Sequence, residues 1–237
     1  IKDAFDVFNE LSKPRDLSMF GTVGSRSATF GPVVTLYDNV PLLKYREVDA
    51  LEFLAKKKPN KMAVLLKKHL GDSLNLEAVH IDKPNFVYTS WWRVAVEETG
   101  QDLGDSAKEK ILKRLMKTLE IWAELDFVNF KPYLLNLLDD ERRIFYRIGL
   151  YFLHIHASKM PLVVAKELGK FENLDNVEIK HEYFLLLENG FQYLSDENQN
   201  ELIAYIQSGP PGATRENIKS FYSSRSLNMK KTLEEYL

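Results

Sequence analysis

Two histidines lie close together in an otherwise apolar stretch, YFLHIHA, at residues 151–157. Imidazoles bind metal ions and transfer protons near neutral pH, so the pair suggests a metal or acid–base site. Successive residues of a helix advance by about 100 degrees, and positions two apart therefore project about 160 degrees away from each other. His154 and His156 cannot hold one metal ion from a single regular helix, and we predict no metal site here.

The surroundings give each histidine a structural interpretation instead. The apolar stripe of this helix is predicted to comprise Ile144, Ile148, Tyr151, Phe152 and Ile155. His156 falls on the flank of Phe152 and is expected at the edge of the core. His154 falls beside Arg147 on a basic flank that we expect to be more exposed.

Lysines form the second group that could do chemistry. They are Lys56, Lys57, Lys58, Lys61, Lys67 and Lys68, followed by His69. Lysines contact phosphates, and the nearby Trp91 and Trp92 offer stacking platforms, so this 56–69 region could bind single-stranded nucleic acid. A solvated rim around a helix break explains the same lysines, and both tryptophans suit a core or helix interface. A nucleic-acid-binding or enzyme-associated helical domain that uses this region is therefore our alternative function, and nucleic acid is not the partner we expect.

The remaining patterns fall short of catalytic motifs. The glycine-rich stretch 20–31, FGTVGSRSATFG, could place backbone N–H groups around an anion, but it lacks the GxxxxGK[ST] of a phosphate loop. Ser223, Ser224 and Ser226 have no GxSxG context. Asp139 and Asp140 are interpreted as helix-capping carboxylates. We predict no catalytic residue, no metal site and no cofactor in this chain.

Composition is that of an ordinary globular protein. Of 237 residues, 45% are hydrophobic and 28% charged, and the net charge of −2 gives no general attraction to nucleic acid or anionic membranes. Cysteine is absent, which excludes disulfides and thiolate chemistry and fits a cytoplasmic location. No apolar run reaches the roughly 20 residues needed to span a bilayer, so we expect no membrane partner. The first residue is Ile1 rather than Met, and we expect a fragment of a larger protein.

The elements that position these residues have mostly helical periodicity. In the second half the first predicted helix covers 106–126 and begins with a capping box of Ser106 and Glu109. Further helices are predicted from 139 or 140 to 157, over 161–168, over 181–190, from a Ser195 cap to 208, and beyond Thr214. In the first half we predict helices over 1–11, 46–58, 60–71 and 85–100. Residues 21–37 are predicted as a loop with a short strand or as a simple connection.

Helix starts near 106, 140 and 178 are separated by 34 and 38 residues, and each opens a two-helix unit. This is the repeat length of tetratricopeptide, armadillo and HEAT proteins. We predict an all-α chain that forms an irregular α-solenoid of helix pairs, with a compact helical bundle as the alternative. Residues 1–104 are predicted as an irregular, mainly helical part and residues 105–237 as the helix-pair repeat region.

Three features of residues 139–211 belong together: an acidic cap before ERRIFYRIGLYFL, the HEYFLLL helix, and the closing helix SDENQNELIAYIQSGP. This stretch resembles the helical-repeat regions of large bacterial NTPases of the STAND class, including antiphage sensors. In that family a helical sensor arm captures a viral protein, the NTPase module oligomerises and an effector acts. The resemblance implies a sensor or scaffold role, a viral protein as partner and oligomerisation through the parent protein; it carries over no catalytic residue.

The sequence therefore predicts a non-catalytic module for protein recognition or scaffolding. Exposed aromatic side chains are expected to contribute most to binding, because they concentrate interface energy. The candidates are Trp91, Trp92, Tyr183, Tyr193 and Tyr205.

Overall fold

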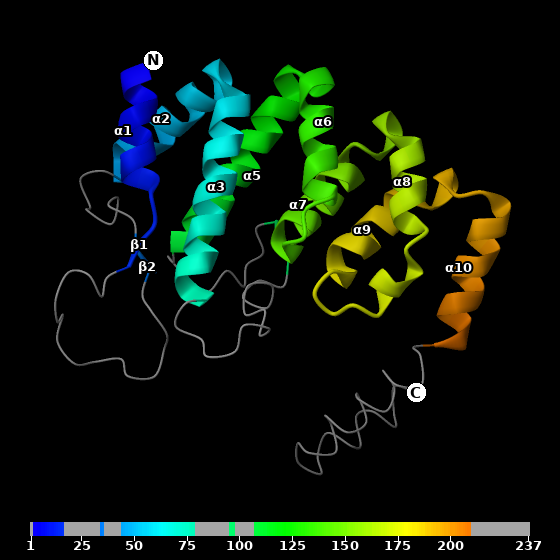
Figure 1. Cartoon of the computed structure of the whole chain (residues 1–237). Helices are drawn as coiled ribbons and strands as arrows, with labels where there is room; N and C mark the ends of the chain where they lie inside the picture. Colours follow the sequence, from blue (N-terminus) through cyan, green and yellow to red (C-terminus); the bar gives the residue numbers. More distant parts are fainter. Residues whose placement is uncertain (1, 17–33, 36–43, 79–94, 98–106, 210–237) are drawn as a thin grey trace, which may run out of the picture. The chain divides into compact units, whose positions relative to one another are not determined.

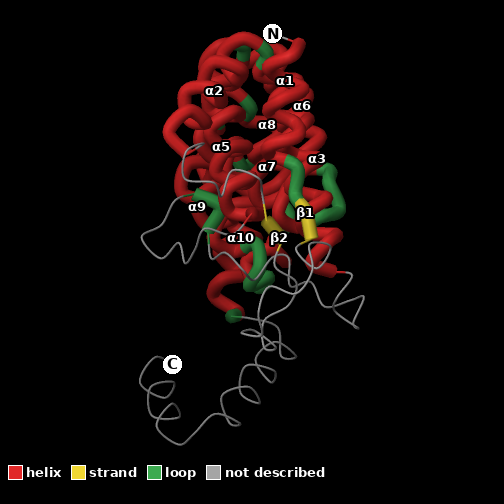
Figure 2. The backbone as a smooth tube through the Cα atoms, turned by 90° about the vertical axis from the view of Figure 1, so that its left-hand side faces the viewer, coloured by secondary structure: helices red, strands yellow, loops and turns green. Residues whose placement is uncertain are grey.

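A computed structural model describes residues 2–16, 34–35, 44–78, 95–97 and 107–209 (Figure 1). Regular structure in this part of the chain is helical apart from two short strands, β1 (Arg15–Asp16) and β2 (Val34–Thr35) (Figure 2). The strands pair antiparallel, with Arg15 opposite Thr35. The all-α fold class is thus confirmed, and the short strand falls within the predicted stretch 21–37.

The chain divides into two compact units, residues 1–152 and 153–237. The predicted regions 1–104 and 105–237 follow the regularity of the sequence pattern, whereas the units follow packing. The helices of residues 107–138 consequently share the first unit with those of residues 44–78.

The helices of the first unit are α1 (Lys2–Ser12), α2 (Lys44–Lys57), α3 (Pro59–Ala78), α5 (Ala107–Leu125), α6 (Phe127–Leu138) and most of α7 (Arg143–Ile155). Within this unit α5 packs against α3, α2 and α6. Its predicted apolar stripe, spaced by three and four residues, is buried as expected: Ile111, Leu115, Leu119 and Trp122 are at most 5% exposed. Ser106 of the predicted capping box lies outside the described residues.

The start of α7 differs from the prediction by a few residues. Asp139 and Asp140 precede the helix, and the Asp140 carboxylate accepts a hydrogen bond from the Arg142 backbone N–H at 3.0 Å. Gly149 of α7 lies against the end of α6. A Cβ on Gly149 would lie 2.9 Å from a methyl carbon of Leu138. The absence of a side chain at Gly149 therefore permits the close approach of α7 to the end of α6.

The second unit contains η3 (Ala157–Lys159), α8 (Pro161–Leu168), η4 (Phe171–Leu174), α9 (Lys180–Gly190), η5 (Phe191–Tyr193) and α10 (Asp196–Ser208). Its helix ends were predicted correctly because their signals are local. Pro161 begins α8, and the Ser195 hydroxyl accepts from the Asn198 N–H at 3.3 Å at the start of α10. Gly209 ends α10 with φ of 69°, a conformation that favours glycine.

The core of the second unit lies between α8 and α9. A Cβ on Gly190 would lie 2.4 Å from a methyl group of Val164, so only glycine allows these helices to approach as closely as they do. Tyr183 is fully buried, and its hydroxyl donates to the Leu168 carbonyl oxygen at 2.5 Å. Among the helices that the structure describes, in both units, none combines the length and apolar character needed to cross a membrane.

Candidate functional site

The two histidines of YFLHIHA have separate structural roles. His154 Nδ1 lies 2.7 Å from the Leu185 carbonyl oxygen, which can only accept, so Nδ1 carries the proton and ties the end of α7 to α9. His156 is half-buried, and burial followed by the nearby Lys159 lowers its pKa. No group of three or more metal-ligating side chains occurs among the described residues.

Two details of the predicted α7 faces are wrong. Arg147, expected on an exposed basic flank, is 1% exposed, whereas Ile155, expected in the apolar stripe, is 45% exposed. His156 is half-buried, which agrees with a place at the edge of the core, and His154 is half-buried rather than more exposed. The prediction assumed one buried face, but packing covers α7 on more than one side over its first ten residues.

The basic region separates into an exposed and a paired part. Lys56, Lys57, Lys58 and Lys61 are exposed where α2 ends and α3 begins, and we call these four residues the lysine corner. Lys67 instead forms an ion pair with Asp140 at 2.8 Å, and both side chains are about 15% exposed. Lys68 is exposed but pairs with Asp72, one helical turn along α3, at 2.7 Å.

His69 is not part of a basic surface, contrary to its place in the predicted cluster. It is 2% exposed and lies between α3 and α1, with Nδ1 3.1 Å from the Ser12 hydroxyl and Nε2 3.0 Å from the Asn9 amide. Burial, together with Lys68, lowers its pKa from 6.5 to about 4. The imidazole is therefore neutral at physiological pH.

The Asn9–His69–Ser12 cluster has the composition of a hydrolytic triad but not its chemistry. Ser12 donates its only hydroxyl proton to the Phe8 carbonyl oxygen at 2.7 Å, so that proton is not given to His69 Nδ1, which lies 3.1 Å away. The His69 Nε2–H donates to the Asn9 amide oxygen at 3.0 Å. Ser12 is also fully buried. The cluster consequently fastens α1 to α3 and offers no nucleophile to a substrate.

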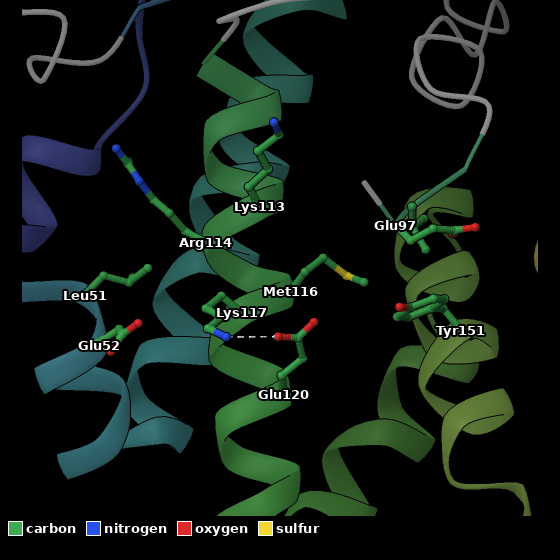
Figure 3. Close-up of a pocket in the computed structure, with 10 residues that line it drawn as sticks. Leu51, Glu52, Glu97, Lys113, Arg114, Met116, Lys117, Glu120 and Tyr151 are labelled. Atoms are coloured by element: carbon green, nitrogen blue, oxygen red, sulfur yellow. Dashed lines mark hydrogen bonds and ion pairs between the residues drawn. The ribbon is translucent and has the colours of Figure 1, made fainter. Parts of the chain in front are cut away.

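A hollow of about 800 Å³ lies in the first unit between α2, α5, α7 and residues 95–97 (Figure 3). Three acidic and three basic side chains line it: Glu52, Glu97, Glu120, Lys113, Arg114 and Lys117. Lys117 pairs with Glu120 at 3.5 Å, and Figure 3 shows Met116 extending from α5 toward Tyr151. Opposite charges offset each other around this hollow, and its wall also contains Leu51 and Val96.

The aromatic candidates fall into three groups. Tyr183 belongs to the core and cannot anchor a partner. Tyr193 and Tyr205 are half-buried, and the Tyr205 hydroxyl donates to the Asp175 carboxylate. Trp91 and Trp92 lie outside the described residues, as do the glycine-rich stretch 20–31 and the serines at 223, 224 and 226.

The most distinctive surface that sequence reasoning missed is on α10. Leu202 is its only fully buried residue, while Ile203 and Ile206 are 42% and 51% exposed. These isoleucines are three residues apart and so lie on the same side of the helix, and Ile206, four residues after Leu202, extends the face that Leu202 begins. We call them the outer face of α10. Exposed β-branched residues gain nothing from packing and are mediocre helix formers, so their presence at neighbouring positions needs another explanation.

Comparison with family models, with curated proteins and with solved structures finds no match to this chain. The functional argument therefore rests on the surfaces described above.

Proposed function

We propose that this chain is a non-catalytic protein-recognition or scaffolding module that binds its partner through the outer face of α10. The observation that carries the proposal is the packing of α10. One row of the helix, through Leu202, attaches it to the second unit, while Ile203 and Ile206 remain exposed. Leu202, Ile203 and Ile206 lie within about 100 degrees of one another, so the apolar stripe of α10 is wider than the part that is buried, and a partner helix or strand would complete the packing.

The repeat-like arrangement is part of the same proposal. The helices α5, α7 and α9 begin at residues 107, 143 and 180, which gives spacings of 36 and 37 residues. Such regular pairs support an irregular α-solenoid, and a compact bundle is the alternative. Stacked helix pairs present extended surfaces that a protein partner can bind, and α10 is the last helix among the residues that the structure describes.

The narrower form of the proposal is a cytoplasmic sensor arm of a bacterial antiviral NTPase. Its support is the resemblance of residues 139–211 to such arms, a stretch that includes all of α10. The captured partner would then be a viral protein, and oligomerisation would be a property of the parent protein. A phosphate-loop motif elsewhere in the parent sequence would favour this form, and a nuclease or polymerase motif would oppose it.

A photo-crosslinking experiment in the natural parent protein tests the binding surface. A photoreactive phenylalanine analogue replaces Ile203, and phage-infected cells are irradiated. We expect a discrete crosslink to a viral protein under the narrower form, or to a host protein under the general form. The matched control places the same analogue at Glu201, an exposed position that projects about 160 degrees from Ile203.

Two substitutions sharpen the result. Ile206→Glu should abolish the crosslink because it places a charge in an apolar contact, whereas Ala204→Glu, at an exposed position that projects about 160 degrees from Ile206, should retain it. Both variants should melt at the temperature of the wild type. Equal crosslinking from positions 203 and 201, or products confined to the chain itself, would contradict recognition through the outer face of α10.

A further inference from the structure

We infer that the lysine corner, together with Phe53, is a binding site for single-stranded nucleic acid. This activity is independent of the outer face of α10 and does not rest on the proposed function. The inference starts from charge. Lys56, Lys57, Lys58 and Lys61 fall within six consecutive residues and are all exposed.

The positive charge of this corner is largely uncompensated. Among the residues that the structure describes, Lys57, Lys58 and Lys61 form no ion pair, and Lys56 has only an exposed contact of 3.4 Å with Glu52. An exposed pair of this kind contributes little stability and exchanges readily with solvent or ligand. The corner therefore concentrates up to four positive charges on a chain whose net charge is −2.

Helix stability explains only part of this cluster. Lys56 and Lys57 occupy the last turn of α2, where cations interact favourably with the helix dipole. Lys61 lies in the first turn of α3, which contains no acidic residue, and a cation gains nothing there from the dipole. The backbone of the corner is already satisfied, since the Lys58 N–H donates to the Leu54 carbonyl at 2.8 Å. The side chains of Lys58 and Lys61 thus gain nothing from either helix dipole at this turn.

An aromatic side chain distinguishes the corner from an ordinary basic rim. Phe53 is 51% exposed and lies three and four residues before Lys56 and Lys57, on the same side of α2. Its ring can stack on a base while the lysines contact the adjoining phosphates. This combination is how proteins bind single strands without sequence preference. A duplex keeps its bases stacked and would use only the lysines.

Titration of a fluorescent oligothymidylate into the complete chain tests the inference by anisotropy. If four lysines each contact a phosphate, the logarithm of affinity should fall with the logarithm of salt concentration with a slope of about −3. The double substitution Lys57→Gln and Lys61→Gln should reduce that slope by about 1.4. The matched control, Lys166→Gln with Lys180→Gln, removes two exposed lysines of the second unit and should leave the slope unchanged.

Phe53 provides the decisive measurement. Phe53→Ala should weaken oligothymidylate binding roughly tenfold, and Phe53→Trp should restore it. Because Phe53 is half exposed, loss of binding through unfolding is checked by an unchanged melting temperature. Absence of binding at low salt would overturn the inference. Equal binding of duplex DNA or polyglutamate, with no effect of Phe53→Ala, would also overturn it and would identify a surface for polyanions or acidic proteins.

Discussion

The helices α5 and α10 both carry amphipathic sequences, but they are packed very differently. In α5, twelve of nineteen residues are buried, because α2, α3 and α6 surround the helix. Even the side chains of Arg114 and Thr118 are enclosed there. In α10, Leu202 is the only buried residue of thirteen. The difference shows that an apolar pattern identifies the residues suited to burial, while the neighbouring elements determine which of them are buried.

The largest expected effect is a difference in the free energy of unfolding between a substitution in α5 and one in α10. Leu115→Ala in α5 removes a fully buried side chain and should lower the free energy of unfolding by about 3 kcal/mol through lost transfer energy and a cavity. Ile203→Ala in α10 removes a half-exposed side chain and should cost less than about 0.5 kcal/mol. Urea denaturation of both variants measures the contrast. Equal losses would mean that the outer face of α10 is already packed within this chain, and the proposed recognition surface would fail.

The parts of the fold that could be predicted from the sequence depend on local signals. Pro161, Ser195 and Gly209 set helix ends through interactions with residues at most three positions away. The stripe of α5 follows from periodicity, which requires no knowledge of the partner helix. The same reasoning places the lysine corner at a helix break, where the structure shows it.

The parts that could not be predicted depend on distant partners. His69 meets Ser12 across 57 residues of sequence, and Lys67 meets Asp140 from another helix. A lysine or histidine next to other basic residues in sequence therefore looked exposed until tertiary contacts were known. The outer face of α10 was missed for a related reason: the sequence marks its isoleucines as apolar but does not say that Leu202 is the only residue of α10 that becomes buried.

The second prediction concerns the polar contact that holds α1 to α3. Folded His69 stays neutral down to its pKa of about 4, whereas the unfolded chain takes up a proton near 6.5. The unfolded state thus binds more protons between these values, and stability should fall as pH decreases from about 6.5 to about 4. The contribution of this group should reach about 3 kcal/mol below pH 4 and level off there.

Comparison with His69→Gln isolates this effect, because other groups titrate in both proteins. The variant should lose about 2 kcal/mol less than the wild type between pH 7 and pH 4.5 in urea denaturation. The variant should also remove the acid sensitivity of the attachment of α1, which is measured by amide hydrogen exchange in α1. The exchange rates of α10 should show no effect of the substitution. Parallel stability curves for the two proteins would show that His69 is already accessible to protons in the folded state.

The smallest expected effect tests how α10 is attached. The Tyr205 hydroxyl donates to the Asp175 carboxylate, and this hydrogen bond raises the pKa of Tyr205 to about 12. Tyr205→Phe should weaken the attachment of α10 by about 1 kcal/mol, since one half-exposed hydrogen bond is lost and no cavity forms. Amide exchange should accelerate about fivefold in α10 and remain unchanged in α5.

Asp175→Asn provides the matched control for this hydrogen bond. It keeps an acceptor oxygen but removes the charge that opposes ionisation of the phenol, so the pKa of Tyr205 should return toward 10. Because the chain has eleven tyrosines, the titration of Tyr205 must be read from the difference between wild type and Tyr205→Phe. If neither substitution alters exchange in α10, then this hydrogen bond does not attach the helix. The packing of Leu202 and the ring contact of Tyr205 with Phe171 would then hold α10 to the second unit.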